Sequence, residues 1–161
     1  MRRLWTFVRL VYLYGLYLLV GLDEGWFQIM KGHYLVELGL FPAAARAYQK
    51  ALRETKTPSV RASLGYAYLC AGLPDRAVEA LREAYSKEPN PDFGAILAWA
   101  LNENGDRAES EALCLSLSAR LSEYSPETQE NLTRLAESLK SGTPNDALQL
   151  TKPAQAIQLR S

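Results

Sequence analysis

The feature of this sequence that most constrains its fold is a repeat with a period of 33 residues. A shift of 33 positions superposes three pairs of glycines, namely Gly32 on Gly65, Gly39 on Gly72, and Gly72 on Gly105. The same shift superposes Ala44, Tyr48, Ala51 and Pro58 on Ala77, Leu81, Ala84 and Pro91. Self-similarity at this period is typical of helical units that bury their apolar faces by stacking on one another. The sequence therefore predicts an all-α repeat protein.

The clearest copy of the repeat runs from Pro58 to Pro91 and reads as two helices joined by a tight turn. Gly65 lacks a Cβ and lets the facing helix approach closely. Gly72 is expected to end the first helix in a left-handed conformation, and Pro74 begins the second helix, where its missing N–H costs nothing. The two apolar faces are Leu64, Tyr68 and Leu69, and then Ala77, Leu81, Ala84 and Tyr85.

This pattern closely resembles the tetratricopeptide repeat. The residues that carry the resemblance are Leu64, Gly65, Tyr68, Gly72, Ala77, Leu81, Ala84 and Pro89. The resemblance covers about Gly25 to Ser122 as three units, and it implies a solenoid of antiparallel helix-turn-helix repeats. Two departures stand out: Lys31 occupies an expected apolar position of the first unit, and the turn from Gly105 to Ala108 is two residues shorter than Gly72 to Ala77. The second departure leaves the register of the third unit open.

A terminal helix and a tail follow the repeats. Ser125, Pro126 and Glu127 form a helix start, and an apolar face of Leu132, Leu135, Ala136 and Leu139 follows. We expect this helix to cap the stack. Pro144 and Pro153 interrupt the remaining residues, which indicates a flexible tail. The predicted organisation is an apolar helix at 1–22, a repeat domain with its capping helix at 23–140, and a tail at 141–161.

The N-terminal segment from Leu4 to Leu22 is apolar or aromatic at 15 of its 19 positions. As a helix it would be roughly 28 Å long, close to the thickness of the hydrocarbon core of a bilayer. Arg9 interrupts it and leaves an uncharged run of only 13 residues, from Leu10 to Leu22, a length more often found in buried helices. Such a helix must be covered by lipid or by protein.

Three interpretations of this segment follow. The favoured one is a single-pass membrane anchor, because Arg2, Arg3 and Arg9 precede any acidic residue; the positive-inside rule then places the N-terminus in the cytoplasm and the repeats across the membrane. A cleaved signal peptide is the second, although the residues before Asp23 contain no small-x-small cleavage site. The third is a soluble cytoplasmic protein whose helix packs in its own groove or against a second copy, as a homo-oligomer.

The rest of the sequence argues against catalysis and against nucleic-acid binding. Basic and acidic residues both number 18, so no net positive charge favours a nucleic acid. His33 is the only histidine, and Cys70 and Cys114 fall within predicted helices without an activating partner. There is no glycine-rich phosphate loop and no cluster of metal ligands in the sequence. We predict no enzyme activity, no cofactor and no metal site.

The resemblance implies that the first helix of each unit lines an inner groove. The ligand-facing positions would be Trp26, Ile29, His33 and Val36 in the first unit, Tyr66 and Leu69 in the second, and Trp99 and Asn102 in the third. Members that clamp the acidic C-terminus of a chaperone use basic residues and asparagine there, a set that this sequence lacks. The groove is predicted to be aromatic and to hold a partner helix or peptide, although Trp26, Tyr66 and Trp99 would equally suit the core between repeats.

Overall fold

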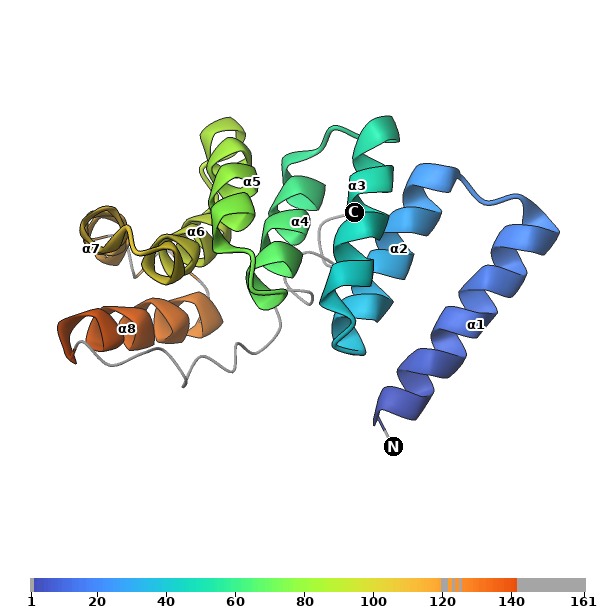
Figure 1. The fold of residues 1–161 in the computed structure, drawn as a ribbon, viewed down its shortest axis with the longest axis horizontal. Helices are drawn as coiled ribbons and strands as arrows, with labels where there is room; N and C mark the ends of the chain where they lie inside the picture. The colour runs from blue at the N-terminus through green and yellow to red at the C-terminus, as the bar shows by residue number, and fades with distance from the viewer. Residues whose placement is uncertain (1, 120–121, 123, 125, 142–161) are drawn as a thin grey trace.

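The computed structural model describes residues 2–119, 122, 124 and 126–141, and these residues form helices with no strand among them. In order the helices are α1 (Arg2–Val20), α2 (Glu24–Glu37), α3 (Phe41–Glu54), α4 (Pro58–Cys70), α5 (Pro74–Lys87), α6 (Pro91–Asn104), α7 (Arg107–Ser118) and α8 (Pro126–Ser141). They follow one another from α1 at one end of the molecule to α7 and α8 at the other (Figure 1). The all-α repeat architecture is confirmed.

Three helix pairs, α2/α3, α4/α5 and α6/α7, repeat with a constant period. The turns within the pairs contain Gly39, Gly72 and Gly105, whose φ angles are 79°, 74° and 92°. Each turn closes with the same two hydrogen bonds: in the middle unit the Leu73 amide donates to the Tyr68 carbonyl at 3.0 Å, and the Gly72 amide donates to the Leu69 carbonyl at 3.0 Å. Only glycine adopts this left-handed conformation without strain, which is why it recurs at this position.

The third unit keeps the register of the other two. α3, α5 and α7 begin at Phe41, Pro74 and Arg107, each 33 residues after the last, so the expected shortening of the third turn is wrong. Ser110, rather than Ala108, takes the position of Ala77. Its hydroxyl is fully buried and donates to the Ala98 carbonyl at 2.6 Å, so a polar residue is accommodated where an alanine was expected.

Close helix approach explains two of the conserved-period glycines. A Cβ on Gly32 would lie 2.5 Å from the Tyr48 ring, and one on Gly65 would lie 2.5 Å from Leu81 Cγ. In the third unit Ala98 stands at the equivalent position and packs against Ser110. The small residue therefore lets the second helix of each unit press against the first.

One apolar core runs through the stack from α2 to α6, and a smaller cluster joins α6, α7 and α8. The smaller cluster contains Leu132 of α8, which is fully buried, and Cys114 and Leu117 of α7. α8 thus covers the end of the repeat stack. The predicted cap residue Ser125 and the tail at 142–161 lie outside the described residues, as do the side chains of Glu127, Leu135 and Leu139.

α1 stands at the other end of the stack, beside α2 and antiparallel to it (Figure 1). Within the described chain, α2 is the only helix that α1 packs against extensively. The interpretation in which this helix lies in the groove of its own chain therefore does not describe this structure.

Candidate functional site

The surface formed by the first helices α2, α4 and α6 carries the eight positions predicted to meet a ligand. Trp26 is 45% exposed, and Ile29, Trp99 and Asn102 are half-buried. His33, Val36, Tyr66 and Leu69 are buried in the apolar core. The side chains that reach solvent are therefore Trp26 and Ile29 on α2 and Trp99 and Asn102 on α6, with the buried residues supporting them from beneath.

Trp99 is the best-defined aromatic group on this surface. Its ring lies 6.5 Å from that of Tyr66, centroid to centroid, and is tilted by 54°. Its indole N–H donates to a carboxylate oxygen of Glu103, one turn further along α6, at 3.2 Å. The buried Tyr66 and the hydrogen bond to Glu103 both restrict the Trp99 rotamer. A large apolar group that is already ordered loses little entropy when a partner covers it.

Trp26 is placed by the start of α2. The Asp23 carboxylate caps this helix by accepting a hydrogen bond from the Trp26 amide at 2.8 Å. The cap holds the indole at the N-terminal end of the first unit, whereas Tyr66 and Trp99 meet at the boundary of the second and third units. The predicted aromatic residues are thus not gathered in one cluster.

His33 has a structural place rather than a ligand-facing one. Its Nδ1 lies 3.2 Å from the Tyr48 hydroxyl, and the two rings meet edge to face with centroids 5.6 Å apart. Burial lowers the pKa of His33 below its ordinary value of 6.5, against the smaller opposing effect of Glu37. The neutral imidazole is a buried polar group satisfied by Tyr48.

Neither thiol is activated for catalysis. Burial raises the pKa of Cys70 to about 11 and that of Cys114 to about 11, so both remain protonated at neutral pH. Among the residues that the structure describes, no group of three or more histidine, cysteine or acidic side chains is placed to hold a metal ion.

A polar pocket of about 410 Å³ between α3, α4 and α5 was not predicted. It is lined by Gln49, Arg61, Leu64, Tyr68, Arg76, Glu79, Ala80 and Glu83. Gln49 Nε2 donates to the Tyr68 hydroxyl at 2.6 Å, and the Arg76 guanidinium lies 5.9 Å from the Tyr68 ring centroid. Arg61 pairs with Glu83 at 2.8 Å. These residues come from three helices, so no local pattern in the sequence could have grouped them.

α1 exposes the largest apolar surface on the molecule's described part. Its outward face consists of Leu4, Trp5, Phe7, Val8, Val11, Tyr12, Leu18, Leu19 and Val20, which are 48% to 85% exposed. Such a patch amounts to roughly 1,000 Å², well above the largest apolar patch of a typical monomer, about 300–600 Å². The segment Arg3–Val20 is long and apolar enough to cross a membrane, and 11% of it is buried.

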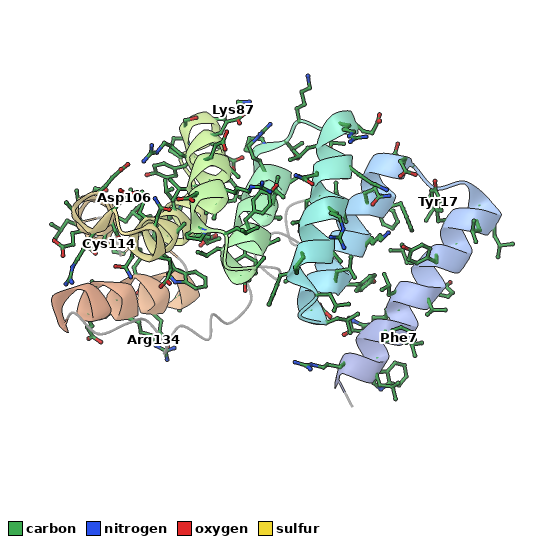
Figure 2. The ribbon with its side chains drawn as sticks, viewed as in Figure 1. Phe7, Tyr17, Lys87, Asp106, Cys114 and Arg134 are labelled. Atoms are coloured by element: carbon green, nitrogen blue, oxygen red, sulfur yellow. The ribbon has the colours of Figure 1, made fainter. Side chains whose placement is uncertain are left out.

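The opposite face of α1 is docked on α2 by specific contacts. The Thr6 hydroxyl donates to Glu37 Oε2 at 2.9 Å near one end of the contact, and the Tyr17 hydroxyl donates to the Glu24 carboxylate near the other. The hydrogen bond from Tyr17 also lowers the pKa of Glu24 below its ordinary value. Figure 2 shows Tyr17 on the side of α1 that faces α2.

Lys31 completes this contact. Its ammonium lies 5.1 Å from the ring centroid of Tyr14 and 5.9 Å from that of Phe27. A cation above aromatic faces is stabilised there. The lysine that departs from the repeat pattern is therefore matched to the aromatic side chains between α1 and α2.

Comparison with known families agrees with this architecture. The family model described as "Tetratricopeptide repeat" matches residues 29–73 and 64–126. These two overlapping matches run from the second turn of α2 to the start of α8 and include all three helix pairs. A comparison with curated proteins finds no match.

Proposed function

This chain belongs to the tetratricopeptide repeat family, and from that premise we propose that it is a membrane-anchored scaffold that holds a protein partner on its repeats. Members of the family are generally non-catalytic interaction modules that bind proteins. The raised pKa values of Cys70 and Cys114 and the burial of His33 fit that role.

The observation that carries the membrane part of the proposal is the outward face of α1. Nine large apolar side chains on one helix are exposed, while the other face of the same helix is docked on α2. Exposed surface of this size and composition is stable in water only when something covers it. A lipid bilayer is the covering that the length, the aromatic side chains and the arginines of the segment favour.

The partner part of the proposal rests on the surface of α2, α4 and α6. Trp99, ordered by Tyr66 and Glu103, is the proposed anchor, and Asn102 on the same helix offers an amide to a partner's backbone. Trp26 and Ile29 extend the surface along α2. An amphipathic helix or an extended peptide with apolar side chains suits such a site.

Cell fractionation tests the anchorage. We expect the full chain in the membrane pellet, and a variant with Val8→Gln, Tyr12→Gln and Leu19→Gln in the soluble fraction. These three side chains lie on the exposed face, so the substitutions leave the contact with α2 in place. Recovery of the unaltered chain in the soluble fraction as a dimer or larger oligomer would favour the alternative, a soluble self-associating module.

Affinity capture tests the partner surface. A protein recovered with the full chain should be lost with Trp99→Ala and reduced with Trp26→Ala. Leu115→Ala is the matched control, because Leu115 is 71% exposed on α7 and lies outside the proposed surface. Thermal unfolding of each variant separates loss of binding from loss of fold. Equal recovery with all three folded variants would remove the tryptophans from the site.

A further inference from the structure

α1 occupies the position of the second helix of a preceding unit. It packs against α2 as α3 packs against α4 and as α5 packs against α6. The exposed side chains of α3 and α5 are nevertheless polar or charged, among them Arg46, Gln49 and Lys50 on α3 and Glu79 and Arg82 on α5. The exposed side chains of α1 are apolar from Leu4 to Val20, apart from Arg9. A plain terminal cap would have the polar surface of its counterparts.

The way α1 docks is incompatible with a helix that crosses a bilayer. α2 runs antiparallel beside it after a connection of three residues, and hydrogen bonds join Thr6 to Glu37 and Tyr17 to Glu24, at the two ends of α2. If the docked helix spanned the membrane, α2 would be carried into the hydrocarbon with Glu24, Lys31 and Glu37. Charged side chains at that depth are strongly unfavourable.

The charge around α1 suits an anionic surface. Arg2, Arg3 and Arg9 lie in or beside its first half, and no acidic residue precedes Asp23. The three nearest acids are turned toward the protein: Asp23 caps α2, Glu24 accepts from Tyr17, and Glu37 accepts from Thr6. Basic residues next to an apolar helix face are attracted to acidic headgroups. Trp5 and Tyr12 are of the types that favour the interface between headgroups and acyl chains.

We propose that α1 lies in the plane of an anionic membrane, with its outward face in the boundary between headgroups and acyl chains and its inner face still docked on α2. This rests on the proposed membrane anchorage and specifies its geometry. The N-terminus and the repeats are then on the same side of the membrane, contrary to the single-pass topology expected from the sequence. The stack stands on the membrane by its N-terminal end, and the surface of α2, α4 and α6 remains open to a partner.

Single-tryptophan variants of the full chain, reconstituted into vesicles, test the geometry. Positions 5, 12 and 19 all lie on the outward face, and a spacing of seven residues keeps them on one side of the helix. One variant retains Trp5, and the others carry Tyr12→Trp or Leu19→Trp with Trp5→Phe. All carry Trp26→Phe and Trp99→Phe, and circular dichroism checks their fold. Phospholipids brominated at different acyl positions then report the depth of each indole.

An in-plane helix places the three indoles at equal depth, near the top of the acyl chains. A spanning helix places position 12 deepest and positions 5 and 19 near the two surfaces; that result would overturn the in-plane geometry and leave the anchorage intact. No quenching at any position, together with a dimer in light scattering, would mean that a second copy covers the face. That outcome would overturn both the geometry and the anchorage.

The charge preference is tested with vesicles of phosphatidylcholine containing or lacking phosphatidylglycerol. We expect Arg3→Gln and Arg9→Gln each to weaken binding to the anionic vesicles about fivefold and to have little effect with the neutral ones. Arg82→Gln is the control, since Arg82 lies on α5 and pairs with Glu109. Equal affinity of the unaltered chain for both vesicles would contradict the role assigned to the arginines.

Discussion

Tyr17 of α1 stacks on Phe27 of α2, with ring centroids 4.1 Å apart and planes 19° from parallel. Tyr14 meets the same ring edge-on at 5.1 Å, so one buried phenylalanine receives two aromatic side chains from the neighbouring helix. The stack lies near the connection between the helices, and the hydrogen bond from Thr6 to Glu37 lies near the far end of α2. α1 is thus held by its inner face along the length of α2, which determines where its apolar outer face points.

The first prediction concerns this contact. Tyr17→Ala removes the stacked ring and should weaken docking of α1 by about 0.5–1.5 kcal/mol beyond the loss of buried area. Tyr17→Phe keeps the ring and loses only the hydroxyl, so its effect should be smaller. Tryptic cleavage after Arg9, which is exposed on α1, measures the opening of the helix. Equal cleavage rates in the two variants and the unaltered chain would show that the stack does not hold α1.

A second prediction concerns the approach of α4 and α5. Gly65→Ala should lower the free energy of unfolding by about 1–3 kcal/mol, because the added Cβ would lie 2.5 Å from Leu81 Cγ. Gly15→Ala is the matched control: nothing lies within 4 Å of its added Cβ, and alanine favours the helix by about 0.5–1 kcal/mol. Urea denaturation measures both. A Gly65→Ala protein as stable as the unaltered chain would mean that the helices separate at no cost.

The third prediction is a pH dependence caused by His33. Burial lowers its pKa in the folded state, so below about pH 6.5 the unfolded chain binds more protons than the folded one. The free energy of unfolding should therefore be constant above pH 6.5 and fall below it, by at most about 1.4 kcal/mol per pH unit. His33→Gln should remove this slope whatever its effect on overall stability. Parallel stability curves for the two proteins between pH 6.5 and pH 5.5 would contradict the buried neutral imidazole.

A fourth prediction concerns the two thiols. With pKa values near 11, Cys70 and Cys114 should react slowly with iodoacetamide at pH 7 in the folded protein. Both should become reactive in denaturant, where their pKa returns to the ordinary range. Rapid alkylation of either thiol in the native state would reveal an activated cysteine and reopen the question of catalysis.

Most of the repeat architecture could be predicted from the sequence, because each unit depends on local signals. Gly72 at positive φ and Pro74 at the next helix start act within a few residues of themselves, and they recur every 33 positions. The third unit was harder, since Ser110 replaces an alanine. A serine is tolerated there only because the Ala98 carbonyl accepts its hydroxyl, which is a contact between helices.

The candidate sites were predicted less completely, because they depend on contacts between distant residues. The sequence alone does not show that His33 and Tyr66 are covered by neighbouring units, or that Gln49, Arg61 and Arg76 meet in one pocket. Docking of α1 left one sign in the sequence: Lys31 stood at an apolar position of the repeat. The structure explains that lysine by the Tyr14 and Phe27 rings beside it.

The most direct measurement of the central claim is flotation of the purified full chain with vesicles of phosphatidylcholine and phosphatidylglycerol. The unaltered protein should float with the vesicles, and the variant carrying Val8→Gln, Tyr12→Gln and Leu19→Gln should stay at the bottom of the gradient with the same helical content. If the variant floats as well as the unaltered chain, or if neither protein floats, the outward face of α1 is not a membrane-binding surface.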